Sequence, residues 1–557
     1  MSVEMLFGGD PVGALLLISA ISLPITIVLS LLILHRYQRA VVRFMQATAG
    51  GGPAPETDRR AGLPAESPPL ALQMEDAGMR PSASVEARAR LARTRRSALQ
   101  AAAVYAVAGS AHASIATVVL FVTSGTEFLP LRTFFVWFIF AWPLVPTVFF
   151  VAVGSRRLRG LGIAAYVLVA LAISPVSWGE LAILWGTFMG VPTLLLIGVG
   201  HRRLRSVGPL VLAACFLILI GSTFAFSLGA NLALLIGANF TAMSAGMVVA
   251  AAVVAAFLAL AWKTLRWIAA RYRRKHMSDL MLTLDAWWLF FTLWECLDFF
   301  AAEGLAGAFV LVAFVVYKLV LALGFGLMAP KAPAETLRLV LLRVFGFRKR
   351  SERLLDELGH KWRYAGPISL ISAPDLATGY VEPHEFLDWL SGRLSRAFIK
   401  SQDDLDARMA TLDGAPDPDG RYRVNEFFCH ADTWQPTMRR LAHDSDAVLM
   451  DLRSFSRSNQ GCAYELRVLF DSVPVERIVL MIDATTDRSC LEELLEDLWR
   501  TLAPTSPNLA PQPKSLRIFS IRSQSTREIN ALLLCLFHSG ATHAPQDQRA
   551  TAERLAG

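Results

Sequence analysis

Charged residues are scarce in this chain. Asp, Glu, Lys and Arg make up 18% of the 557 residues, whereas apolar residues make up 54%. Because a soluble protein of this length needs more charge on its surface, the composition excludes a wholly soluble protein and indicates membrane spans. The net charge of +8 does not indicate nucleic-acid binding, because most arginines adjoin apolar segments, where they orient a chain in the bilayer.

Cysteines and nucleotide-binding motifs are also scarce. The six cysteines have no CxxC or other metal-ligand spacing, so the sequence predicts no metal site. There is no GxGxxG and no Walker loop, and the usual nucleotide fingerprints are therefore absent. We expect buried, reduced thiols and infer no certain cofactor from these motifs.

Long apolar runs, by contrast, fill the sequence as far as about residue 328. The first predicts an N-terminal membrane anchor over residues 1–35, because its apolar core is too long for a cleaved signal peptide and basic residues follow it. The others predict a multi-span domain over residues 98–328. Its eight spans are expected at about 98–124, 130–153, 161–177, 181–200, 207–228, 242–262, 282–301 and 305–328.

Basic clusters fall at alternate connections between these spans. The segments Arg156–Arg159, His201–Arg205 and Lys263–Lys275 are basic, whereas the other connections are short and neutral or acidic. Because positive loops stay inside, this alternation predicts nine spans in the cell inner (plasma) membrane. It places the N-terminus outside and the C-terminal domain in the cytoplasm.

Two further segments are expected on the cytoplasmic side. Residues 36–97 are rich in Pro, Ala, Gly and Glu, which predicts a flexible linker, and they end in an Arg-rich stretch expected to lie against anionic headgroups. Residues 329–365 mix leucines with arginines. We expect this second segment to form an amphipathic, basic connector along the inner membrane face.

The last two spans carry ionisable residues, which are costly at membrane depth and are often functional. With a hairpin turn between the spans, Lys318 comes within about one turn of Asp285, so the two should pair. Glu295 and Asp298 lie one turn apart on the same helix. One interpretation is a cation or proton path, and the other is a structural ion pair with two acids near the interface. Because no unwound Gly/Pro pair or internal repeat marks a transport site, we favour the structural interpretation, and we expect His112 to be a helix-packing residue.

From about residue 366 the sequence becomes a mixture of strand-like and helical patterns. Five short, apolar, strand-like segments alternate with amphipathic helices, which predicts an α/β domain over residues 366–540 with an open, doubly wound parallel sheet of the flavodoxin-like kind. The residues after 540 are expected to form a disordered tail, 541–557. The predicted strands are Pro367–Ser372, Arg423–Phe428, Asp446–Leu452, Arg477–Ile482 and Leu516–Ile521.

The strand Asp446–Leu452, the turn and helix start Ser456–Leu466 and the strand Arg477–Ile482 together resemble a Toll/interleukin-1 receptor (TIR) domain. That family has an apolar strand, a Ser-rich turn, a Trp-Cys-x-x-Glu-Leu motif opening a helix, and another apolar strand. Cys462, Glu465 and Leu466 match the motif, while Gly461 replaces its Trp. The Ser-Tyr-x-x-x-Asp that usually follows the first strand is also missing, and Ser372-Ala-Pro-Asp375 stands in its place.

The resemblance implies a chemistry for Glu465. In enzymatically active TIR domains the motif glutamate acts in cleavage of the nicotinamide–ribose bond of NAD, whose positive, oxocarbenium-like transition state a fixed carboxylate stabilises. Independently, ligands of open α/β sheets bind beyond the carboxyl ends of the strands. The residues expected in such a cleft are Ser372, Asp375, Phe428, Asp432, Asp451 and Arg453, each of which could equally be a capping or turn residue.

Three functions remain open at this point. The leading one is signalling, in which the cytoplasmic TIR-like domain of a bilayer-embedded protein acts by self-association or by binding another TIR-like protein. In that case the resemblance implies that the loop Phe428–Trp434, expected to be exposed, makes domain–domain contacts. The second is an NAD-cleaving effector, as in bacterial defence, with NAD as substrate and Glu465 as the catalytic residue. The third is a transporter or channel that the soluble domain regulates.

Overall fold

The computed structural model of the protein describes residues 11–48, 72–76, 84–152, 156–174, 177–185, 190, 193, 204, 207–237, 240–328, 336–343, 348–372, 381, 383–412, 414–509, 514–523 and 525–541. The chain divides into two compact units. The helical unit comprises Met1–Tyr37, Leu99–Ala329 and Val381–Arg393. The sheet unit comprises Gln38–Ala98, Pro330–Tyr380 and Leu394–Gly557.

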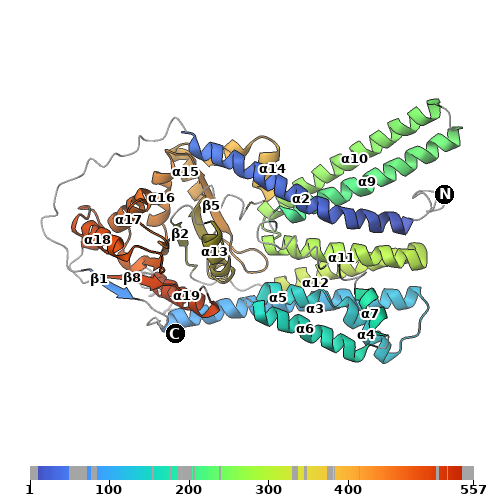
Figure 1. Ribbon diagram of the computed structural model, residues 1–557, viewed down its shortest axis with the longest axis horizontal. Coiled ribbons are helices and arrows are strands. Elements are labelled where there is room, and N and C mark those ends of the chain that lie inside the picture. Colours follow the sequence, from blue (N-terminus) through green and yellow to red (C-terminus); the bar gives the residue numbers. More distant parts are fainter. Residues whose placement is uncertain are drawn as a thin grey trace. The chain divides into compact units, whose positions relative to one another are not determined.

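The helical unit is built from apolar helices (Figure 1). Its helices, two of which continue into the sheet unit, are α2 (Pro11–Gln46), α3 (Val85–Thr123), α4 (Pro130–Phe140), α5 (Leu144–Ala152), α6 (Arg156–Ile173), α7 (Trp178–Trp185), α9 (Gly208–Ile236), α10 (Phe240–Arg273), α11 (Asp279–Glu303), η2 (Gly304–Val310), α12 (Leu311–Met328) and α14 (Pro383–Leu390). In the helix pair α9–α10, Gly229 and Gly246 face each other so closely that a Cβ atom on either would lie within about 2.5 Å of the other's carbonyl oxygen. Small residues therefore allow these two backbones to touch.

Five helices among the described residues are long and apolar enough to cross a membrane, which is consistent with a membrane protein. They lie within α2, α3, α9, α10 and the segment η2–α12, and α4 with α5 gives a sixth if this pair, bent by 48°, forms one span. Of the other predicted spans, α6 has only a short apolar stretch, most of 181–200 lies outside the described residues, and α11 carries the three acids. The structure thus supports five or six of the nine predicted spans.

The sheet unit contains one parallel sheet of eight strands (Figure 1). Its order is β1-β8-β7-β6-β2-β3-β5-β4, and every neighbouring pair is parallel. The strands are β1 (Gln73–Asp76), β2 (Leu339–Arg343), β3 (Ile368–Ile371), β4 (Phe398–Ile399), β5 (Val424–Cys429), β6 (Ala447–Asp451), β7 (Ile478–Ile482) and β8 (Ser515–Ser520). The helices are α13 (Arg348–Trp362), α15 (Gln402–Ala410), α16 (Trp434–His443), α17 (Gln460–Ser472), α18 (Arg488–Arg500) and α19 (Thr526–Ala541).

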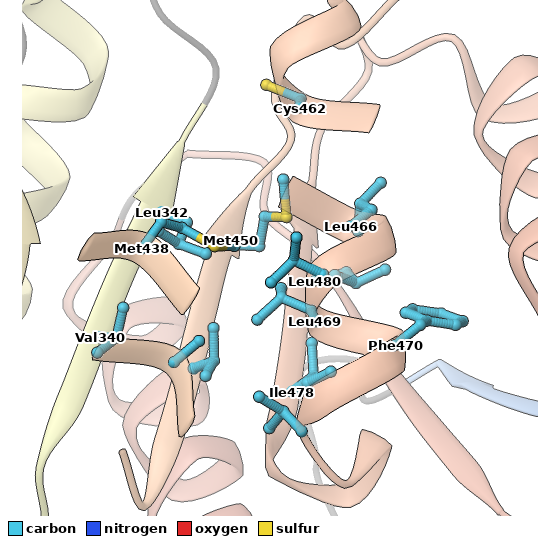
Figure 2. Close-up of a cluster of buried hydrophobic side chains, with 14 of the residues drawn as sticks. Val340, Leu342, Met438, Met450, Cys462, Leu466, Leu469, Phe470, Ile478 and Leu480 are labelled. Carbon is cyan, nitrogen blue, oxygen red and sulfur yellow. The ribbon is translucent and has the colours of Figure 1, made fainter. Parts of the chain in front are cut away.

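Helices cover both faces of this sheet, because its inner strands are apolar on both sides. On one face, α15, α16, α17 and α18 pack on the strands and form the α17-side core. Figure 2 shows this core with Val340 and Leu342 of β2, Met450 of β6, Ile478 and Leu480 of β7, Met438 of α16, and Cys462, Leu466, Leu469 and Phe470 of α17. On the other face, α13, α19 and Ala87 at the start of α3 form the α19-side core. The sheet is therefore doubly wound.

The five predicted strands all occur, with ends within one or two residues of the expected ones. The connector predicted over residues 329–365 differs from the expectation. Within it, Leu339–Arg343 forms β2, the central strand between β6 and β3, so the prediction that it lies along the membrane face is wrong for these residues. Leu339 and Leu341 lie in the α19-side core, and Val340 and Leu342 lie in the α17-side core. Burial of each side chain stabilises the fold by about 1.5–3 kcal/mol.

Two other expectations change in the same way. The linker predicted over residues 36–97 contains the strand β1 and the first turns of α3. Apolar residues recur with helical spacing from Glu385 to Ile399, which predicts one helix, but α14 ends at Leu390 and Phe398–Ile399 is the edge strand β4. Local patterns missed these elements because β1 and β4 are short and are defined by backbone pairing with distant strands.

Candidate functional site

The carboxyl edge of the sheet is the place where an open α/β fold binds ligands. The strand order reverses between β2 and β6: β2 continues through α13 to β3 on one side, and β6 continues through α17 to β7 on the other, over the opposite face. Arg343 ends β2 and is the register partner of Asp451, which ends β6. Residues 344–347 and 373–380, which follow β2 and β3, lie outside the described residues, and with them the predicted cleft residue Asp375.

Two of the predicted cleft residues pair with each other. The Arg453 guanidinium donates from Nε to Asp451 Oδ1 (2.8 Å) and from Nη2 to Asp451 Oδ2 (2.6 Å), and the Arg453 backbone N–H donates to Oδ1 (3.2 Å). Both side chains are 4% exposed. This forked pair fixes the turn after β6, where Ser454 has a positive φ of 61°. Asp451 and Arg453 therefore neutralise each other's charge and have a structural role at the carboxyl edge of the sheet.

Glu465, the predicted catalytic residue, is buried on α17, with 3% of its surface exposed. It lies one turn beyond Cys462, whose thiol is also buried. Burial, followed by the negative charges of Glu465 and Asp451, raises the pKa of Cys462 to about 12. Glu465 and Asp451 thus both act electrostatically on this buried thiol.

Ser372 directly follows β3 and is also buried. Its backbone N–H donates to the carbonyl of Phe427 in β5 (2.8 Å), and its hydroxyl has no hydrogen-bond partner among the described residues. The side chain is 6% exposed, so an unsatisfied hydroxyl here is costly. Ser372 is the predicted cleft residue with hydrogen-bonding capacity to spare.

The loop after β5 is not the exposed surface that the sequence predicts. Phe428 is 1% exposed and packs on Phe398 of β4, with ring centroids 5.5 Å apart. His430 and Thr433 are buried, and Asp432 is half-buried. The expectation of an exposed Phe428–Trp434 loop is therefore wrong for most of its residues.

The last turns of α2 cover this loop. The Phe44 ring lies 5.3 Å from that of Phe398 and 6.5 Å from His430, and the His430 Nδ1 lies 2.7 Å from the Phe44 carbonyl oxygen. The backbone N–H of Ala431 donates to the carbonyl of Ala47 (3.2 Å). The loop thus satisfies carbonyl groups that the end of a helix leaves without intrahelical partners. The sequence gives no signal for this contact, because Phe44 and His430 are 386 residues apart.

The helical unit contains the predicted ion pair. Lys318 of α12 donates to Asp285 of α11, so the expected pairing across the hairpin is confirmed. Trp288, one turn along α11, stacks on Tyr317 with ring centroids 5.0 Å apart. Gly109 of α3 leaves room for this indole, since a Cβ atom there would lie 2.7 Å from it.

A second polar cluster joins α3 to α11. The Thr292 hydroxyl donates to the Trp288 carbonyl (2.8 Å), so it accepts from His112 Nε2 (2.7 Å). His112 Nε2 also lies 3.8 Å from the Glu295 carboxylate, and both side chains are fully buried. His112 is therefore more than a packing residue. Asp298 follows on the same helix, and its side chain lies outside the described part.

Asp285, Trp288, Thr292 and Glu295 form one stripe along α11, at intervals of three and four residues. The stripe spans about 15 Å of helix. Each acid on it has a basic or imidazole side chain nearby: Lys318 for Asp285 and His112 for Glu295. No group of three or more metal-ligating side chains occurs among the residues that the structure describes. These contacts favour a structural stripe that fixes α3, α11 and α12 to one another.

A double-mutant cycle tests the ion pair. We expect Lys318→Ala to lower the midpoint of thermal unfolding of the detergent-solubilised protein more than the double change with Asp285→Ala does, because the single change leaves a buried carboxylate uncompensated. The coupling free energy should be about 1 kcal/mol or more. Additive effects of the two changes would show that the pair contributes no stability.

No protein-family model matches the chain, and no curated protein matches it either. The fold class therefore stands on the strand order and the packing of the described residues, and the function is a matter for proposal.

Proposed function

We propose that this chain is a membrane signalling protein, in which apolar helices pass a change of state to a TIR-like α/β domain that acts by self-association or partner binding. The observation that carries the proposal is helix continuity. The helices α2 and α3 each have one part in the helical unit and one in the sheet unit, with the boundaries at Tyr37/Gln38 and Ala98/Leu99. Because each helix is continuous across its boundary, the proposal is that a displacement of either helix in the bilayer is passed along that helix.

Both helices end against parts of the sheet unit that are well packed. The last turns of α2 hold the loop after β5 through Phe44 and His430. At the start of α3, Ala87 is fully buried in the α19-side core and Leu91 packs against it. A transmitted movement would thus act on the core and on the carboxyl edge of the sheet.

The strand order supports the TIR-like part of the proposal. Taken alone, the five strands β3-β2-β6-β7-β8 have the order 2-1-3-4-5 when numbered along the chain, which is the flavodoxin-like order. The Cys462–Glu465–Leu466 motif lies on the helix between the third and fourth of them, as the resemblance implies. The additional strands β1, β4 and β5 extend the sheet at its two sides.

The proposed location is the inner (plasma) membrane, with the N-terminus outside and the sheet unit in the cytoplasm. Its support is the alternation of basic connections, together with exposed arginines on the parts of α2 and α3 that belong to the sheet unit. A reporter fused at Gly557 should read cytoplasmic, and one inserted at Glu180 should read external. An external C-terminus would overturn this topology.

Truncation of the aromatic contact tests the coupling through α2. We expect Phe44→Ala to destabilise the docked loop by about 1–3 kcal/mol, since a half-buried ring is lost. Hydrogen exchange of the full-length protein should then quicken in residues 430–433 and remain unchanged in α11 and α12. Arg43→Ala, an exposed neighbour in the same turn, is the matched control and should leave exchange unchanged. Equal hydrogen exchange of residues 430–433 in the two variants would exclude α2 as a route of coupling to this loop.

A second candidate function is cleavage of NAD. The observation that favours it is that the motif residue Glu465 is buried on α17, the helix that joins β6 to β7 next to the point where the strand order reverses. A fixed carboxylate there is what an oxocarbenium-like transition state requires. The buried hydroxyl of Ser372, which has no hydrogen-bond partner within the described part of the chain, adds a hydrogen-bonding group at the same edge.

The two candidates make different predictions for Glu465→Gln. If the protein cleaves NAD, this change should lower NAD consumption on the order of a hundredfold or more while folding stays intact, because it removes the charge and keeps the shape. If the sheet unit acts by association alone, the purified full-length protein should consume no NAD and Glu465→Gln should retain self-association. Comparable NAD consumption by the two forms would exclude Glu465 as the catalytic residue.

A further inference from the structure

The strand β1 closes one edge of the sheet with a segment from far away in the chain. Gln73–Asp76 pairs in parallel with Ser515–Ile518 of β8, and the Gln73 backbone N–H donates to the Lys514 carbonyl (3.0 Å). Glu75 and Ser515, which meet through a hydrogen bond of 3.2 Å, are 440 residues apart. The first strand of the chain is therefore paired with the last.

The pairing of β1 depends mainly on its backbone. All four of its residues are exposed, so none is buried in either core. Its side-chain contacts to β8 are made by Glu75, whose carboxylate accepts from the Ser515 hydroxyl and lies 3.9 Å from Arg517 Nε. Leu72, just before the strand, packs partly against the α17-side core. A short strand with so few side-chain contacts is easily displaced.

The strand β8, by contrast, is built as an interior strand. Leu516 and Ile518 belong to the α17-side core and Phe519 to the α19-side core. Arg517, although charged, is 7% exposed and donates to the Glu476 carbonyl (2.7 Å) and to Ser539 (2.9 Å). Without β1, this well-ordered strand would present unpaired backbone groups at an open edge, which is a template for pairing with another chain.

We propose that β1 is exchanged between two copies of this chain, so that each β1 pairs with β8 of the other copy in the register seen within one chain. Every copy carries both the strand and its matching edge, including Glu75 for Ser515, so the exchange needs no new complementary surface. The exchange deepens the proposed function, on which it rests for its meaning, because it names a second copy as the partner and a sheet edge as the contact.

Chain length sets the geometry of the exchange. Between the end of α2 at Gln46 and the start of β1 there are 26 residues, and eight residues lie between Asp76 and the start of α3 at Val85. Eight extended residues reach about 26–29 Å. The β8 edge of the second copy must therefore lie within that distance of the Val85 end of α3.

Disulfide trapping between two tagged copies tests the exchange. One full-length copy carries Gln73→Cys and the other Ser515→Cys, both with Cys296→Ser and Cys490→Ser because these two thiols are half-buried. Gln73 and Ser515 are register partners, and the spacing of adjacent strands suits a disulfide. After coexpression and mild oxidation in membranes, we expect a species of twice the chain mass that carries both tags.

Two controls define the result. Met74→Cys, whose side chain points to the opposite face of β1, should give no such species with Ser515→Cys. A chain carrying both Gln73→Cys and Ser515→Cys shows whether β1 pairs with β8 at all. If that chain forms only an internal disulfide and the two tagged copies never cross-link, β1 belongs permanently to its own sheet and the exchange is excluded. Absence of both disulfides would exclude the pairing itself.

The outcome is separate from that of the signalling proposal. Cross-linking reports only where β1 is paired, whereas the Phe44→Ala experiment reports whether α2 acts on the loop after β5. If dimers are trapped and hydrogen exchange is unaltered in Phe44→Ala, the strand exchange is supported and the coupling through α2 is excluded. If no dimer is trapped and hydrogen exchange quickens in Phe44→Ala, the coupling is supported and self-association must use a surface other than β1 and β8.

Discussion

The burial of β2 on both faces is the interaction on which the sheet unit depends. Its five residues lie between β3 and β6, so they join the two halves of the sheet. Leu339 and Leu341 pack on one face, and Val340 and Leu342 on the other. Only ten residues separate this strand from the end of α12 at Met328. The centre of the sheet is therefore the first part of the fold that the chain reaches after its long apolar helices.

The sequence predicts the strands that side-chain burial defines. β3, β5, β6, β7 and β8 are short segments rich in apolar residues and bounded by turns and helices, and the sequence predicts their ends to within one residue. β2 is equally apolar, but Arg338 and Arg343 at its ends make the segment resemble an amphipathic surface helix. β1 is polar and short, and it exists because β8 offers a backbone edge. The sequence of these four residues alone cannot predict that they pair with a strand edge hundreds of residues away.

The same distinction applies to the candidate sites. Lys318 and Asp285 lie on consecutive helices, so helix geometry and a turn suffice to predict their pairing. His112 and Thr292 are 180 residues apart, and Phe44 and His430 are further apart still. Glu465 was found by its motif, but its burial follows from how α17 packs on β6 and β7, which a motif does not specify. Spacing along the chain thus predicts neighbours on one helix hairpin and misses contacts between remote helices.

The pairing of the first strand with the last has a consequence for biosynthesis. A ribosome adds about 5–20 residues each second, so the 440 residues between Glu75 and Ser515 take about 20–90 s to make. Throughout that time, β1 has emerged while its partner edge does not exist, and the long apolar helices are inserted in the interval. β1 can thus pair with β8 of its own chain only near the end of translation. On a polysome, the nearest completed β8 can belong to the chain ahead, which is the arrangement that the proposed strand exchange requires.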